Sequence, residues 1–206
     1  AVDFMNCTLS NLLYILGTRI TFISKHPIPK NVPLIIVSNH QSMHDICPLS
    51  CYLKKYHPKF VSKIELGKGI PGVSYNLTHG GSVLIDRKDA RQALTAIKDF
   101  GKYIEENKYT AVIFPEGTRS EKGHVGVREF KKGGFHLAAN AGAAVIPVHF
   151  GGVGPWLPKG DFRITKAGVV KVKYGAPIYS TNVEELRDKC YDAVVALSNE
   201  KKQVTH

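Results

Sequence analysis

Short apolar runs rich in β-branched residues alternate with helical patterns along most of this 206-residue chain. Several of the runs are apolar at every position, which is typical of strands that are covered on both faces. The predicted strands are residues 33–38, 59–63, 82–86, 109–115, 143–150 and 169–175. This alternation predicts an α/β fold, with a largely parallel central sheet flanked by helices, in a single domain spanning residues 1–206.

Two amphipathic helices are predicted in the later part of the chain. Residues 89–106 carry an apolar stripe, and Asp89 is placed to cap the first turn. Residues 182–202 repeat the pattern, and Thr181 followed by Glu184 predicts a capping box. The Gly/Pro-rich stretch at 151–161 predicts a long loop between the last two strands.

Residues 1–25 form a predicted N-terminal helical segment. Its apolar side chains fall mostly on one side of an amphipathic helix at 4–16, namely Phe4, Leu9, Leu12, Leu13 and Leu16. This side either packs on the core or contacts a membrane surface. No apolar run reaches the roughly 18 residues that cross a bilayer. Because the chain starts with Ala rather than Met, an upstream anchor segment is also an open possibility.

The chain is strongly basic, with a formal net charge of +11. Such a charge favours an anionic partner, either a phosphorylated metabolite, a coenzyme, nucleic acid or an acidic membrane, although some of it simply keeps the surface soluble. The cysteines show neither the spacing of a zinc site nor a dense disulfide pattern; they are Cys7, Cys47, Cys51 and Cys190. Buried, reduced thiols are therefore expected, and they point to a cytosolic location.

Polar residues follow three predicted strands. SNHQSMHD follows PLIIV, IDR follows SVL, and PEGTRS follows YTAVIF. The carboxyl ends of parallel strands are where functional groups gather in open α/β sheets. In the first of these stretches, Asp45 can return its carboxylate to the imidazole of His40 and leave the other ring nitrogen free to accept a proton. A helix-capping pair is the structural alternative.

No Ser or Cys of the chain matches a nucleophile pattern beside His40, so we expect a base that deprotonates a substrate hydroxyl directly. Cations that suit a phosphate follow the other strands, namely Lys63, Arg87, Arg119, Lys131 and Lys132. A turn held by a Glu116–Arg119 ion pair is the alternative for the third stretch. The sequence shows no metal-ligand spacing, nucleotide fingerprint or nucleic-acid recognition motif.

Four ordered motifs resemble the glycerolipid acyltransferases of the 1-acylglycerol-3-phosphate acyltransferase type. They are NHQSMHD (39–45), GSVLIDR (81–87), FPEGTRS (114–120) and VIPV (145–148), and the resemblance extends from about residue 17 onwards. It implies the glycerol-3-phosphate acyltransferase-like fold, with His40 as general base and Asp45 as its orienting partner. It also implies that the acceptor's glycerol phosphate is held by Lys63, Arg87, Glu116, Gly117, Thr118 and Arg119. Pro147 would shape the acyl-donor side.

The resemblance implies transfer of a fatty acyl group from acyl-CoA or acyl-ACP to the free hydroxyl of 1-acyl-sn-glycerol 3-phosphate. The product would be phosphatidic acid, made in phospholipid biosynthesis without a covalent acyl-enzyme, a bound cofactor or a metal. Expected partners are the lysophosphatidic acid-type acceptor, the thioester co-substrate and an anionic membrane surface, but no nucleic acid. The expected location is the cytoplasmic face of a membrane, peripheral or anchored by a segment absent from this chain.

Two alternatives share these motifs. The first keeps the chemistry but changes the acceptor to glycerol 3-phosphate or another lysophospholipid. The second is a non-catalytic phospholipid-binding protein, which the intact pair of His40 and Asp45 disfavours because binding alone needs no base.

Overall fold

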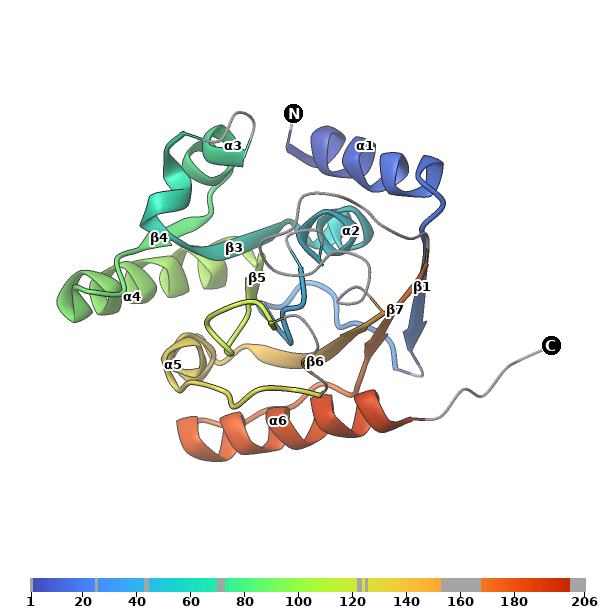
Figure 1. Ribbon diagram of the computed structural model, residues 1–206. Coiled ribbons are helices and arrows are strands. Elements are labelled where there is room, and N and C mark those ends of the chain that lie inside the picture. The colour runs from blue at the N-terminus through green and yellow to red at the C-terminus, as the bar shows by residue number, and fades with distance from the viewer. Residues whose placement is uncertain are drawn as a thin grey trace.

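The computed structural model describes residues 2–24, 26–42, 45–69, 73–121, 124, 126–152 and 168–200 (Figure 1). The strands are β1 (Arg19–Ser24), β2 (Leu34–Ser38), β3 (Pro58–Lys63), β4 (Val83–Ile85), β5 (Thr110–Ile113), β6 (Ala144–Gly151) and β7 (Val169–Tyr174). The helices are α1 (Val2–Ile15), α2 (Ile46–Tyr52), α3 (Val73–His79), α4 (Ala90–Asn107), α5 (Gly133–Asn140) and α6 (Val183–Asn199). Two 3₁₀ turns, η2 (Lys54–Tyr56) and η3 (Ile64–Gly67), flank β3.

Within the described residues the strands form one sheet in the order β1-β7-β6-β2-β5-β3-β4. The five strands from β6 to β4 are parallel, whereas β7 is antiparallel to β6 and parallel to β1. The predicted α/β class with a largely parallel sheet is therefore confirmed. All six predicted strands form, while β1 and α3 were not predicted. Most of the predicted loop at 151–161 lies outside the described residues.

Helices cover both faces of the sheet (Figure 1). On one face, Leu13 of α1, Leu49 of α2 and Leu53, which caps the end of α2, pack against alternate residues of the central strands. On the other face, side chains of α4, α5 and α6 form a second cluster. Every residue of β2 is buried, because the strand is covered on both sides. This explains why the central strands are apolar at consecutive positions.

Only one of the two predicted helix caps is confirmed. Asp89 caps α4, since its side chain accepts hydrogen bonds from the backbone N–H groups of Arg91 and Gln92, both at 3.0 Å. The cap of α6 is Asn182 rather than the predicted Thr181, so α6 begins one residue later than the capping box required. Asn182 has the same short side-chain acceptor that a cap needs, and the extended backbone at this residue brings it to the first turn.

The orientation of α1 is the reverse of what core packing predicts. Its buried side holds two polar residues, Asn6 and Ser10, together with Leu13. Asn6 donates a 2.8 Å hydrogen bond to the hydroxyl of Ser50 on α2, so the contact between the two helices is partly polar. The apolar side chains left exposed are Phe4 (79%), Leu9 (39%), Leu12 (47%), Ile15 (81%) and Leu16 (47%). Core packing is therefore the wrong interpretation of this apolar side, with Leu13 as the exception.

A disulfide between Cys7 and Cys51 joins α1 to α2. The prediction of reduced thiols is wrong for this pair, while Cys47 and Cys190 are free. Spacing along the sequence draws attention to Cys47 and Cys51, one helical turn apart, but the partner that meets Cys51 lies 44 residues away. The cysteine argument for a cytosolic location no longer holds. Among the described residues, no helix has both the length and the apolar character to cross a bilayer.

Candidate active site

The end of β2 is held to the end of β6 by Asn39. Its side-chain amide donates to the carbonyl of Phe150 at 2.9 Å, and its carbonyl accepts from the N–H of Phe150 at 2.7 Å. Asn39 is 1% exposed, so both bonds are shielded from water. The pair of bonds fixes the position of the next residue, His40, at the carboxyl edge of the parallel strands.

His40 and Asp45 meet as predicted. Nδ1 of His40 lies 3.0 Å from Oδ2 of Asp45, and the same oxygen accepts from the backbone N–H groups of Gln41 (2.7 Å) and Ser42 (2.9 Å). α2 begins only at Ile46, so Asp45 precedes the helix rather than lying one turn inside it. Its side chain makes no cap hydrogen bond to α2 and turns back to His40 instead.

The hydrogen bonds determine which nitrogen of the imidazole carries the proton. A carboxylate oxygen that already accepts two backbone N–H groups acts as an acceptor toward the ring as well, so Nδ1 of His40 is the donor. Nε2 is then the nitrogen that can accept a proton. Asp45 is fully buried, whereas the His40 side chain is 16% exposed and can reach a substrate.

The segment that follows β5 packs against His40. The ring of Phe114 stacks on the imidazole with the ring centroids 4.1 Å apart and an interplanar angle of 22°. The N–H of Ser120 donates to the backbone carbonyl of His40 at 2.8 Å. The first and third motifs, about 75 residues apart in the sequence, therefore form one site through the adjacent strands β2 and β5.

Glu116 lies in this segment but is buried, at 3% exposure. Its carboxyl lies near the backbone N–H of His40 and accepts a long hydrogen bond, 3.4 Å, from the backbone N–H of Arg128. Burial raises the pKa of Glu116 to about 7. Its other oxygen, Oε2, has no hydrogen-bond partner among the described residues. The alternative of a Glu116–Arg119 ion pair is therefore not what the structure shows.

Cationic side chains converge on Gly117, at the turn of the same segment. Arg87, which follows β4, donates through Nη1 to the carbonyl of Gly117. The end of the Lys131 side chain lies 3.4 Å from where a Cβ on Gly117 would be. Gly117 has φ +73°, so the turn itself favours glycine. Thr118 and Arg119 are half-buried in the same turn.

Two of the predicted cations are placed differently from these. Lys132 forms an ion pair with Glu184 on α6, and its contribution to a phosphate pocket stays a prediction. Lys63 is exposed at the end of β3, the strand next to β5, and its contribution to a phosphate pocket stays a prediction.

A family model for acyltransferases matches residues 19–151 of this chain, which include His40, Asp45 and the whole segment at 114–120. The chain belongs to the acyltransferase family.

Relatives in the family share the name of one activity. A chloroplastic 1-acyl-sn-glycerol-3-phosphate acyltransferase of Brassica napus is 33% identical over 82% of this chain and 47% of its own length. The mouse 1-acyl-sn-glycerol-3-phosphate acyltransferase alpha is 28% identical over 86% of this chain and 61% of its own. The chain thus spans about half the length of the curated relatives it matches.

A solved structure shows the same fold. The crystal structure of the 1-acyl-sn-glycerophosphate acyltransferase PlsC from Thermotoga maritima aligns with a TM-score of 0.80 and 29% sequence identity, over all of this chain and 80% of that one. The fold expected from the motifs is confirmed.

In this member of the acyltransferase family, Pro147 lies buried in the middle of β6, in register with Val37 of β2. Its neighbour Val145 belongs to the cluster under α6, and strand alternation places Pro147 on that same face. The ring packs against Gly175, whose N–H donates to the carbonyl of Pro147 at 2.9 Å. The role of Pro147 on the acyl-donor side stays a prediction.

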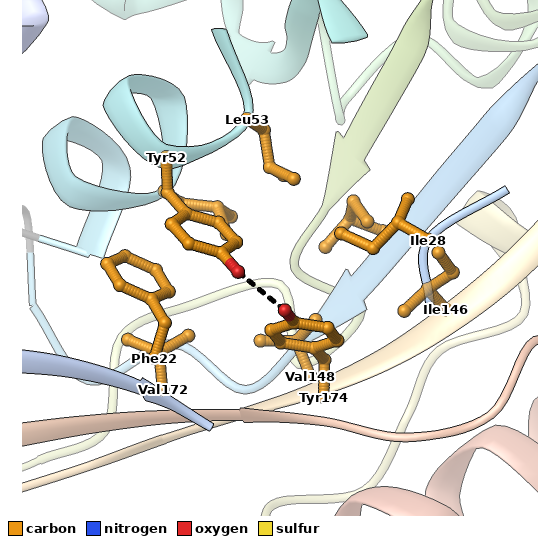
Figure 2. A pocket seen from close by; sticks show the side chains of 10 residues that line it. Phe22, Ile28, Tyr52, Leu53, Ile146, Val148, Val172 and Tyr174 are labelled. Atoms are coloured by element: carbon orange, nitrogen blue, oxygen red, sulfur yellow. Dashed lines mark hydrogen bonds between the residues drawn. The ribbon is translucent and has the colours of Figure 1, made fainter. Parts of the chain in front are cut away.

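An apolar cavity lies on the opposite face of the acyltransferase sheet, between α2 and the strands β1, β2, β6 and β7 (Figure 2). Its free volume is only about 10 Å³, room for about one water molecule, and its accessible wall is entirely apolar. Figure 2 shows the hydroxyl groups of Tyr52 and Tyr174 facing each other, and they are 2.5 Å apart. Phe22 stacks on Tyr52 with the ring centroids 3.8 Å apart.

Three residues of this site hold or contact His40 in a way that the sequence did not show. Asn39 and Ser120 stand inside quoted motifs, but only the folded chain shows that they hold the backbone around His40. Phe114 reads as the last apolar residue of a strand until its ring is found on the imidazole. The signal available for all three was their immediate proximity to the charged motif residues.

Proposed function

We propose that the chain transfers a fatty acyl group from a thioester, acyl-CoA or acyl-ACP, to the free hydroxyl of 1-acyl-sn-glycerol 3-phosphate, giving phosphatidic acid. The observation that carries the proposal is that His40, as a base, and a cationic turn lie in one site. The buried Asp45 holds the imidazole of His40, while Arg87 and Lys131 meet at Gly117 in the segment bonded to His40. The named activity of the relatives supports the same acceptor.

The proposed chemistry starts at Nε2 of His40. This nitrogen takes the proton of the acceptor hydroxyl as the oxygen forms its bond to the thioester carbonyl carbon. The resulting tetrahedral intermediate collapses, the carbon–sulfur bond breaks, and the thiolate takes the proton back from the imidazolium. Asp45 stabilises the imidazolium between these two steps. General-base assistance supplies about 10²–10⁴ in rate, and positioning of the two substrates adds to it.

The phosphate of the acceptor is placed at the turn around Gly117. Arg87 and Lys131 supply positive charge there, and Arg119 in the same turn adds a guanidinium fork that suits phosphate oxygens. Lys63 and Thr118 would add further donors. An acceptor held at its phosphate presents its glycerol hydroxyl to His40, because the cationic turn and the imidazole belong to one hydrogen-bonded segment.

The acyl chain of the donor is placed in the apolar cavity next to α2. The accessible wall offers no polar group, as an alkyl chain requires. The hydroxyl pair of Tyr52 and Tyr174 bounds the cavity, and Tyr52 is 42% exposed, so this end faces the outside of the protein (Figure 2). The closed cavity has a free volume of only about 10 Å³, so this proposal requires the side chains around it, the two tyrosines among them, to move apart when the chain enters.

The proposal also includes a peripheral contact with an anionic membrane, where both acceptor and product reside. α1 supports it, because the helix buries Asn6 and Ser10 and exposes Phe4 and Ile15, at 79% and 81%. A helix that turns its large apolar side chains outward gains free energy when they enter the interfacial region of a bilayer. The net charge of +11 adds attraction to anionic lipid, at about 1 kcal/mol for each Lys or Arg near the surface.

The test offers the purified chain labelled acyl-CoA and acyl-ACP, in the presence of anionic vesicles, against a panel of acceptors. The panel contains 1-acyl-sn-glycerol 3-phosphate, glycerol 3-phosphate and other lysophospholipids. We expect phosphatidic acid to form fastest from the first acceptor, and His40→Ala to abolish transfer while lysophosphatidate binding persists. A folded chain that binds lysophosphatidate but transfers to no acceptor would instead be a phospholipid-binding protein. Faster transfer to another acceptor would correct the substrate.

A further inference from the structure

The surroundings of Glu116 differ from those of a phosphate ligand. The side chain is buried at 3% exposure, while its neighbours Gly117, Thr118 and Arg119 are half-exposed to the solvent. A carboxylate would also repel a phosphate held by the adjacent cations. The residue that the motif resemblance places at the phosphate therefore has a different environment from the residues that follow it.

The contacts of Glu116 lead to the base instead. Its carboxyl lies near the backbone N–H of His40 and accepts a hydrogen bond from that of Arg128. Four residues later, the N–H of Ser120 donates to the carbonyl of His40 at 2.8 Å. The segment from Glu116 to Ser120 thus bonds the C=O of His40 and places a buried carboxyl near its N–H, and the ring of Phe114 lies on the imidazole.

Gly117 reverses the direction of this segment, so the residues on either side of it face different parts of the site. Its positive φ of 73° reverses the chain, so that its own carbonyl meets Arg87 while the preceding side chain points into the protein. A residue other than glycine would be strained in this conformation. The outer side of this turn therefore faces the cationic pocket, and its inner side faces the backbone of His40.

We propose that Glu116 is a positioning residue that fixes the backbone of His40, and thereby the direction of its imidazole, rather than a ligand of the acceptor phosphate. The inference rests on the proposed function, since it assigns Glu116 a part in the step that His40 performs. It follows that loss of the Glu116 carboxylate lowers kcat and leaves the KM for the acceptor unchanged.

The pH dependence of this role follows from the charges around Glu116. Burial raises its pKa to about 7, the carboxylate of Asp45 raises it further, and Arg128 together with the two backbone N–H groups opposes the rise. The ionised carboxylate is the stronger hydrogen-bond acceptor, so it holds His40 more firmly at pH 8 than at pH 6. A glutamine side chain accepts a hydrogen bond equally well at pH 6 and at pH 8. The ratio of wild-type kcat to Glu116→Gln kcat should therefore increase with pH.

The experiment measures acyl transfer by wild type, Glu116→Gln and the matched control Glu129→Gln, which changes an exposed glutamate on the same loop. At pH 8 we expect Glu116→Gln to lower kcat by about 10- to 100-fold, as for a charged hydrogen bond replaced by a neutral one, with the acceptor KM within about twofold. At pH 6 the loss should shrink to about threefold or less. Glu129→Gln should behave as wild type.

Two kinetic outcomes would overturn the proposal. A raised acceptor KM with unchanged kcat would make Glu116 part of the phosphate site. An equal loss of kcat at pH 6 and pH 8 would reduce it to a merely structural residue.

An NMR titration of the wild type tests the contact without any variant. The backbone amide protons of His40 and Arg128 should shift with a common midpoint near pH 7, where the carboxyl between them titrates. Two amides that show no common midpoint would overturn the contact itself. If the wild type transfers no acyl group, the proposed function is wrong. The titration still tests, independently of activity, whether Glu116 contacts the backbone of His40.

Discussion

Replacement of Asp45 by Asn removes the negative charge of this residue while keeping nearly the same side-chain shape. Oδ2 of Asp45 accepts from Nδ1 of His40 at 3.0 Å and from two backbone N–H groups. The amide oxygen of an asparagine can accept the same three bonds, so the loop and the proton on Nδ1 are retained. The amide nitrogen would replace Oδ1, a buried atom without a partner among the described residues. An unsatisfied buried donor costs about 1–3 kcal/mol of stability.

What Asp45→Asn removes is the negative charge that faces the imidazolium during the proposed reaction. Two unit charges 3.0 Å apart attract by about 5 kcal/mol at an effective dielectric constant of about 20. Each 1.4 kcal/mol corresponds to about tenfold in rate, so we expect kcat to fall by about 10³–10⁴. The acceptor KM should stay within about twofold, because the charge acts only once the proton has moved.

The assay follows the free thiol released from an acyl thioester, at varied acceptor concentration. Denaturant unfolding of the same samples reports how much of each variant is folded. Asp99→Asn, which changes an exposed aspartate on α4, is the control and should match the wild type in both measurements. A fall in stability with kcat within tenfold of wild type would refute the reasoning. Asp45 would then serve only to hold the loop before α2.

Three further predictions concern the disulfide, a buried histidine and the cavity. Reduction of the Cys7–Cys51 bond, which closes a 44-residue loop, should lower the free energy of unfolding by about 2–4 kcal/mol in urea, and Cys51→Ser should abolish the effect of dithiothreitol. Burial lowers the pKa of His149 to about 4, so the unfolded chain binds more protons below pH 6.5 and stability falls with falling pH. Between pH 7 and pH 5 the loss is about 2 kcal/mol, and His149→Gln should remove it; equal losses in both proteins would contradict the assignment. Ile28→Phe, which enlarges a side chain on the wall of the apolar cavity by about one methylene, should lower kcat/KM for a 16-carbon donor about fourfold relative to a 12-carbon one, at about 0.8 kcal/mol per methylene, whereas Val32→Phe at an exposed position should change neither.

Features that depend on neighbouring residues were predicted well. The six strands, the α4 helix with its Asp89 cap, and the pairing of His40 with Asp45 all arise within short stretches of sequence. Hydrophobic periodicity and turn chemistry act over such distances, so the residues involved carry the information themselves. β1 was missed because, within the described residues, it lies at the edge of the sheet and pairs only with β7, about 150 residues later in the sequence.

Features that depend on remote partners were predicted poorly. The sequence left the apolar side of the first helix open between the core and a membrane surface, and the structure shows that α1 rests on α2 through Asn6 and Ser50 and turns Ile15 outward. Lys132 was predicted near a phosphate, and the start of α6 adds Glu184 as a partner that the sequence did not indicate. In each case the side chain had two chemically reasonable partners, and only the packing of distant elements selected one.

By itself, the sequence determined the α/β class, the strands that carry the motifs and the local pairing of His40 with Asp45, because each follows from periodicity or from residues a few positions apart. Only the tertiary structure decided that Cys7 meets Cys51, that the apolar side of α1 faces outward and that Glu116 turns inward to the backbone of His40. The physical reason is that burial and hydrogen bonding between remote segments depend on how the helices and strands pack. That packing is a property of the whole chain and cannot be derived from any one of its motifs.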